Sequence, residues 1–154
     1  MTVLKKLLLI VNPNAGTRQA HRLLPEMISA LTAGGYLVTV CVTDKNGDAS
    51  AFARDHAGDA DLVVACGGDG TLNEVVSGLL SGGHATPVGY IPAGSTNDFA
   101  ATLGLSRTCW PPVKQYAAVP SADWIWDVSG RTGISAIPLP SARSPAFPGP
   151  RRRT

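Results

Sequence analysis

Four short apolar runs in the first hundred residues constrain the fold of this chain most strongly. They are rich in leucine and β-branched residues and cover residues 7–12, 36–42, 61–66 and 88–91. Such runs are typical of buried strands, and strands joined by crossover helices pair in parallel. The sequence therefore predicts an α/β fold, in which a parallel sheet has helices on both faces.

Helices are expected between these strands. Apolar residues recur at helical spacing over residues 23–31, and two glycines at 34–35 follow as a stop signal. Pro25 lies inside that pattern, so we expect the helix to be kinked there or to begin later than its first apolar residue. A second helix is expected to have Asp48 as its N-cap and to run through Ala57, and a third is expected over residues 71–80.

Composition narrows the class of protein and its partners. The chain has 154 residues, 44% hydrophobic and 16% charged, which is typical of one globular domain. Its formal net charge is +2, and three arginines lie at positions 151–153, so the rest offers no footprint for nucleic acid. The three cysteines are far apart in the sequence and predict reduced thiols in a cytoplasmic protein. No segment is apolar enough to span a bilayer, so any contact with lipid would be peripheral.

The composition changes after about residue 104. Trp110, Pro111 and Pro112 would break a helix, and residues 135–153 are crowded with proline, serine, alanine and arginine without periodicity. Such a segment cannot bury enough apolar surface to order itself. We therefore expect an ordered domain over residues 1–108 and an irregular, disordered segment over residues 109–154.

A glycine-rich segment at residues 67–71, Gly-Gly-Asp-Gly-Thr, directly follows the third predicted strand. Its glycines let the backbone turn tightly and approach a ligand, at a helix N-terminus that favours phosphate. The segment is neither a Walker loop nor a dinucleotide fingerprint, because its glycine spacing differs and no Lys-Ser/Thr pair follows. Asp69 should repel phosphate unless it holds a metal or accepts a proton. Glu74 either complements the helix dipole or orients the glycine loop or a metal-bound water.

Two further polar loops follow predicted strands. Residues 92–100, Pro-Ala-Gly-Ser-Thr-Asn-Asp-Phe-Ala, come after the fourth strand, and in isolation Ser95 or Thr96 there could be an ordinary N-cap. Residues 12–16, Asn-Pro-Asn-Ala-Gly, come after the first strand and in isolation are a turn. Open α/β sheets bind ligands at the carboxyl ends of their strands. We therefore expect the three loops to form one site.

Together these loops resemble the diacylglycerol-kinase catalytic-domain family, which includes bacterial lipid kinases and sphingosine kinases. Its motif Asn-Pro-x-x-Gly is matched at 12–16, Gly-Gly-Asp-Gly-Thr-x-Asn-Glu at 67–74, and Pro-x-Gly-Thr-x-Asn-Asp-Phe-Ala at 92–100. Ser95 stands where the family usually has threonine, and the hydroxyl is retained. The resemblance implies the nucleotide-binding domain of a lipid kinase, with a fold similar to those of phosphofructokinase and NAD kinase.

The resemblance also implies cofactors, partners and site residues. ATP and Mg²⁺ are the expected cofactors, a diacylglycerol-like lipid at the membrane surface is the expected acceptor of the γ-phosphate, and a homodimer is allowed. Asp69 is the candidate catalytic residue, near the metal or the phosphates, while the metal ligands stay unassigned. The residues expected to contact the nucleotide are Asn12, Thr43, Gly67, Gly68, Asp69, Gly70, Thr71, Leu72, Asn73, Glu74, Ser95 and Asn97.

The family's second domain, a β-rich sandwich, is expected to be missing. It supplies the acidic base and much of the magnesium and lipid site, so we expect nucleotide binding without efficient turnover. If the codons for residues 134–150 are read one base earlier, the degenerate genetic code permits an aromatic, glycine-bearing sequence similar to the start of that domain. This similarity suggests a frameshift within residues 127–133. Two different functions remain open, a catalytically dead nucleotide-binding fragment and an NAD kinase, which shares a Gly-Gly-Asp-Gly loop.

Overall fold

The structure is a computed structural model that describes residues 4–98 and 125–126. Its strands are β1 (Lys5–Val11), β2 (Tyr36–Val42), β3 (Leu62–Gly67), β4 (Val88–Pro92) and β5 (Ile125–Trp126). Its helices are α1 (Gln19–Ala33), α2 (Asp48–His56) and α3 (Asp69–Ser81), and a short 3-10 helix at Ala57–Asp59 follows α2. The four predicted strands are confirmed to within two residues at each end. The predicted boundary at residue 108, and nearly all of the segment beyond it, lie outside the described residues.

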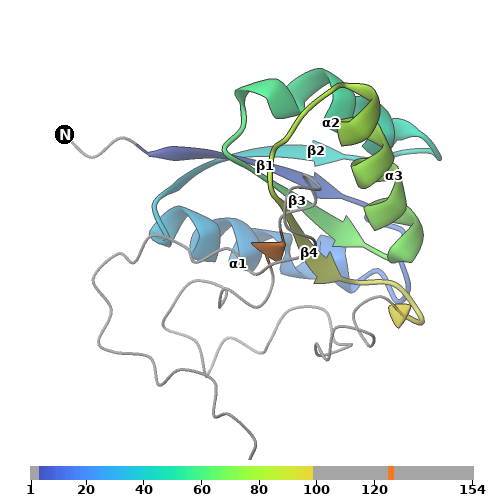
Figure 1. Cartoon of the computed structure of the whole chain (residues 1–154). Helices are drawn as coiled ribbons and strands as arrows, with labels where there is room; N and C mark the ends of the chain where they lie inside the picture. The colour runs from blue at the N-terminus through green and yellow to red at the C-terminus, as the bar shows by residue number, and fades with distance from the viewer. Residues whose placement is uncertain (1–3, 99–124, 127–154) are drawn as a thin grey trace, which may run out of the picture.

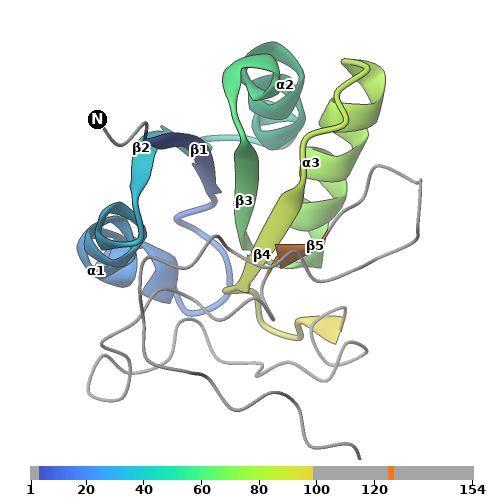
Figure 2. The same cartoon turned by 60° about the vertical axis from the view of Figure 1, so that its left-hand side comes forward.

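The strands form one sheet in the order β2-β1-β3-β4-β5. The first four are parallel, and β5 pairs antiparallel with β4. Figures 1 and 2 show α1 on one face of the sheet and α2 and α3 on the other. This confirms the predicted fold class. The strand order reverses between β1 and β3, which is the place where sheets of this kind bind ligands.

Successive residues of β1 enter two separate cores because side chains alternate between the faces of a strand. Leu7, Leu9 and Val11 pack on the side of α1, and Leu8 and Ile10 pack on the side of α2 and α3. A strand covered on both faces is apolar at every position. That explains why the buried strands could be recognised in the sequence as unbroken apolar runs.

Helix α1 begins before its proline. It starts at Gln19 and contains Pro25, so of the two alternatives, a kink or a later start, the later start is wrong. Ala20, Met27 and Leu31 are all buried against the sheet, on both sides of the proline in sequence. Burial of this apolar face outweighs the backbone hydrogen bond that proline cannot donate.

Replacing Pro25 with alanine is expected to stabilise the protein. The proline side chain is exposed, so the substitution removes no core contact and restores a helical N–H donor. We expect the free energy of unfolding to rise by about 1–3 kcal/mol in urea titrations of the two proteins. An unchanged or lower value would show that the helix is already adapted to the proline.

The start of α2 differs from the prediction by one residue. Gly47 is the N-cap and Asp48 is the first helical residue. Oδ2 of Asp48 accepts the backbone N–H groups of Asp44 and Lys45 at 2.9 and 3.0 Å, and these bonds lower the pKa of Asp48. Asp48 therefore closes the loop after β2 and does not cap the helix. Helix α3, expected from residue 71, begins two residues earlier, within the glycine segment.

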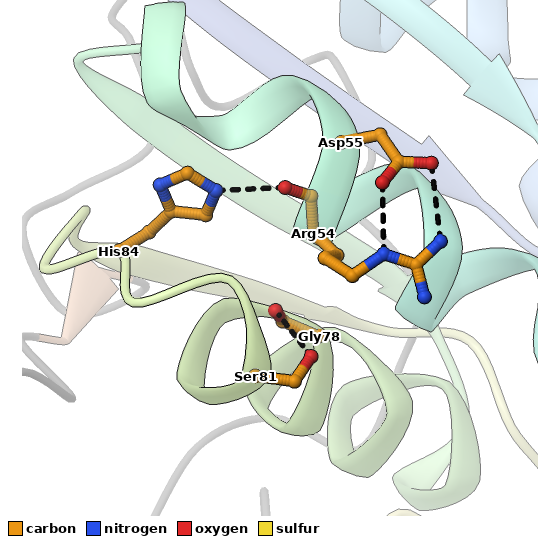
Figure 3. A network of polar contacts seen from close by, with 5 residues as sticks. All are labelled: Arg54, Asp55, Gly78, Ser81 and His84. Atoms are coloured by element: carbon orange, nitrogen blue, oxygen red, sulfur yellow. Dashed lines mark hydrogen bonds and ion pairs between the residues drawn. The ribbon is translucent and has the colours of Figure 1, made fainter.

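The C-terminal ends of α2 and α3 are joined at the far side of the domain from the three loops. Nε2 of His84 lies 2.7 Å from the carbonyl oxygen of Arg54. Oγ of Ser81 donates to the carbonyl of Gly78 at 3.0 Å. Figure 3 shows both contacts as dashed lines. Arg54 also pairs with Asp55, but both side chains are exposed and such pairs contribute little. The contact of His84, just after α3, helps to fix the end of α3 against α2, whereas the bond of Ser81 lies within α3 itself.

Candidate nucleotide-binding site

The three polar loops leave neighbouring strands at the same edge of the sheet. The backbone N–H of Asn12 donates to the carbonyl of Cys66 at 2.8 Å, and that of Ala93 donates to the carbonyl of Gly67 at 2.7 Å. The ladder of hydrogen bonds thus continues past the ends of β1 and β4. This confirms that the three predicted loops lie together at the carboxyl ends of the strands.

The loops contact one another through glycine backbone. A Cβ added to Gly94 would lie 2.5 Å from Cα of Gly68. A Cβ added to Gly16, whose φ is +51°, would lie 2.6 Å from the carbonyl oxygen of Ala93. No larger residue fits at either position without separating the loops. The loops therefore meet without side chains at these two positions.

Helix α3 begins in the middle of this contact. Gly68 is its N-cap, and no side-chain cap is found within the described part of the chain. The first N–H groups of a helix have no partner inside it and favour phosphate. A Cβ added to Gly70, in the first turn, would meet nothing within 4 Å. The start of α3 therefore fits an anionic group such as a phosphate.

Asp69 joins two of the loops. Its Oδ1 accepts the hydroxyl of Tyr90 at 3.3 Å, and its Oδ2 accepts the backbone N–H of Asp98 at 2.8 Å. Mg²⁺ is commonly held by one or two carboxylates together with substrate phosphates, and Asp69 fits that donor set. Within residues 4–98 and 125–126 no group of three or more His, Cys, Asp or Glu could hold a metal.

Asn97 shapes the loop after β4. Its side chain is 2% exposed and its φ is +50°. Oδ1 accepts the N–H of Gly94 at 2.8 Å, and Nδ2 donates to the carbonyl of Gly94 at 2.9 Å. Ser95 and Thr96 are exposed on the loop that this ring of bonds closes. The helix that either residue was expected to cap would lie mostly outside the described residues.

Asn12 links the first loop to α3. Its Nδ2 donates to Oγ1 of Thr71 at 3.3 Å, and its Oδ1 accepts the N–H of Asn14 at 3.0 Å. Thr71 itself is buried. Two residues predicted to contact the nucleotide are therefore in contact with each other, and together they hold the loop at 12–16 against the glycine segment.

The remaining candidates lie around the first turns of α3 and the loop after β2. Oε2 of Glu74 accepts the N–H of Gly47 at 3.1 Å, so it ties α3 to the loop that carries Thr43. Thr43 is buried and Asn73 is exposed. The side chain of Leu72 packs in the core beside α2 and α3. A contact between Leu72 and a nucleotide would therefore involve its backbone.

Sequence reasoning missed Tyr90 and the backbone of Asp98. Tyr90 is fully buried in β4, and burial, followed by the negative charge of Asp69, raises its pKa. Its hydroxyl therefore stays protonated at neutral pH and can donate to Asp69. The available signal was a single hydroxyl in the otherwise apolar run at 88–92.

Comparison with known proteins agrees with this geometry. The family described as diacylglycerol kinase catalytic domain matches residues 6–123. The chain belongs to this family. Because the match begins in β1 and extends past β4, all three loops of the diacylglycerol kinase catalytic domain lie inside it. The individual contacts of these loops with ATP stay predictions.

Relatives and solved structures point the same way. The chain is 38% identical over 105 residues to a diacylglycerol kinase of Bacillus subtilis (strain 168), covering 68% of this chain and 35% of the relative. It is 40% identical over 98 residues to a diacylglycerol kinase of Staphylococcus haemolyticus (strain JCSC1435), covering 63% and 30%. A crystal structure of a Bacillus anthracis diacylglycerol kinase superposes with a TM-score of 0.62 at 35% identity, over 70% of this chain and 40% of that one. The chain thus spans about a third of the length of these curated relatives.

None of the helices that the structure describes is long and apolar enough to cross a bilayer.

Proposed function

We propose that the three loops bind ATP with Mg²⁺, and that this domain is the nucleotide-binding half of a lipid kinase. The observation that carries the proposal is the side-chain-free contact of Gly16, Gly68 and Gly94 beside the N-terminus of α3. Backbone amides at such a position suit a polyphosphate. Family membership supports a kinase over other proteins that bind phosphate.

In this proposal different described residues bind different parts of the nucleotide and its metal. Backbone groups of residues 67–71 hold the phosphates, and Asp69 faces the metal, which would neutralise charge on the phosphates during transfer. Thr43, Asn73 and Ser95 fix the rest of the nucleotide. The acceptor is a lipid hydroxyl of the diacylglycerol class, as the names of the relatives suggest, met at the cytoplasmic surface of a membrane.

We further propose that this chain binds ATP without efficient transfer, because a frameshift within residues 127–133 would replace the sequence that builds the acceptor part of the site. The hypothesis that a frameshift occurred within residues 127–133 is part of the same proposal. Sequencing the coding DNA tests it directly. If no single-base shift opens a frame similar to the rest of the family, the hypothesis is wrong.

Calorimetry on the 154-residue chain tests the nucleotide site. We expect binding of ATP in the presence of Mg²⁺, and no phosphorylated NAD when NAD is offered with ATP. A lipid assay with diacylglycerol vesicles distinguishes a complete kinase from a chain that only binds the nucleotide. Binding without turnover indicates an incomplete site, and rapid phosphorylation contradicts it. Failure to bind ATP would overturn the proposed function.

The substitution Asp69→Asn should affect ATP binding in opposite directions with and without metal. With Mg²⁺ the affinity should fall about tenfold, because the amide is a poorer ligand than the carboxylate. In EDTA the affinity should rise about fivefold, because a charge that repels phosphate is removed. The exposed Asp59, in the 3-10 helix after α2, supplies the control Asp59→Asn. Equal losses in both conditions would show that Asp69 does not act on the metal.

A further inference from the structure

Tyr90 brings a buried hydroxyl to the junction of two site loops. Its ring is fully buried in the core shared with Leu72 and Val75 of α3. Its hydroxyl oxygen lies 3.3 Å from Oδ1 of Asp69 and 3.5 Å from Oδ1 of Asn97. One side chain of β4 therefore contacts both the glycine segment, through Asp69, and the loop after β4, through Asn97.

The hydroxyl has one proton to donate, and Asp69 and Asn97 each place an acceptor oxygen near it. The closer acceptor is the charged carboxylate of Asp69, and hydrogen bonds to charged groups are the stronger ones. Oδ1 of Asn97 already accepts the N–H of Gly94 at 2.8 Å. The proton of Tyr90 is therefore directed at Asp69.

Both oxygens of Asp69 are thereby held, by β4 and by the loop that follows it. Oδ1 is held by Tyr90, and Oδ2 by the backbone of Asp98 at 2.8 Å. A carboxylate bonded at both oxygens cannot rotate freely about its last side-chain bond. The carboxylate of Asp69 is therefore held in a defined orientation.

We propose that Tyr90 is a positioning residue, whose hydroxyl orients the carboxylate of Asp69 toward the metal of bound Mg·ATP. The inference rests on the proposed function, because it assumes that the loops bind a nucleotide with its metal. Groups that orient a metal ligand from behind typically change metal affinity by about 10–100-fold when they are removed.

The test is Tyr90→Phe, which keeps the buried ring and removes the hydroxyl. The dissociation constant of ATP should rise about tenfold in Mg²⁺ and less than about twofold in EDTA. Tyr36→Phe is the matched control. Tyr36 is also a buried tyrosine with a raised pKa, but it lies at the first residue of β2, away from the loops. It should change either constant less than about twofold.

A double-mutant cycle asks whether Tyr90 acts through Asp69. In the Asp69→Asn background, Tyr90→Phe should cause no further loss of Mg²⁺-dependent affinity, because residues that act as a unit are not additive. Additive losses would overturn the proposal. So would a Tyr90→Phe loss that is equal in Mg²⁺ and in EDTA, since that is the result expected of a merely structural role.

Amide hydrogen exchange separates this inference from the proposed function, because it needs no nucleotide. Releasing Oδ1 of Asp69 should loosen its bond to Asp98, so the amide of Asp98 should exchange about threefold faster or more in Tyr90→Phe. It should be unchanged in Tyr36→Phe. If the wild-type chain binds no ATP, the proposed function fails, while this measurement still decides whether Tyr90 orients Asp69. An unchanged rate overturns the inference.

Discussion

Gly94→Ala is expected to bind Mg·ATP about 10–100-fold more weakly than the wild-type chain. The new Cβ would lie 2.5 Å from Cα of Gly68, so backbone must move before the methyl group fits. Overpacking of this kind costs about 1–3 kcal/mol. The easiest relief is to separate the loop after β4 from the glycine segment, and that separation opens the phosphate site. Calorimetric titration of both proteins measures the loss.

Gly35→Ala controls for the general cost of replacing a glycine. Gly35 has a φ of +89°, so alanine is strained there, but nothing lies within 4 Å of the added Cβ. Its carbonyl accepts the N–H of Lys5, which places it at the opposite edge of the sheet from the loops. The control should lose stability and keep its affinity for ATP. If Gly94→Ala also keeps that affinity, the glycine contact is not part of the binding site.

Leu9→Ala should lower the free energy of unfolding by about 2–5 kcal/mol. Leu9 is fully buried at the centre of β1, opposite Val40 of β2 and Val64 of β3, and it packs on the side of α1. Close packing on every side leaves the cavity little freedom to collapse. Because domains of this size are stable by about 5–15 kcal/mol, the loss is a large fraction of the total. Urea denaturation followed by circular dichroism measures it.

Leu80→Ala is the matched control for the core substitution. Leu80 lies in α3 with 68% of its surface exposed, so the same truncation should change the free energy of unfolding by less than about 0.5 kcal/mol. A large effect at Leu80 would mean that something covers it in the whole protein. A small effect at Leu9 would contradict the described packing of β1.

The sheet could be predicted because its strands are buried on both faces. Runs such as residues 62–66 are apolar at every position, and glycine or polar residues mark their ends. Helix boundaries were less predictable because they depend on packing. The start of α1 is decided by burial of Ala20 and Met27 against the sheet, which no local pattern around Pro25 reveals. The end of α3 was easier to predict, because a glycine, Gly82, is its C-cap. The helix stops one residue after its predicted end.

The candidate site could be predicted as loops but not as contacts. The glycine motifs at 67–71 and 92–98 placed the site, since parallel strands bring their carboxyl ends together. The bonds between Glu74 and Gly47, and between Asp69 and Asp98, join residues 27 and 29 positions apart. Such pairs depend on the angle between α3 and the loops, which a single sequence does not contain.

The glycine contact at the loop tips has a thermodynamic consequence. The loops meet through backbone at Gly16, Gly68 and Gly94. Glycine has no side chain, so ligand binding costs no side-chain conformational entropy at these positions. The site is then preorganised, and binding should spend little of its free energy on ordering the protein. Affinity for phosphate would come from a rigid surface that exists before the ligand does.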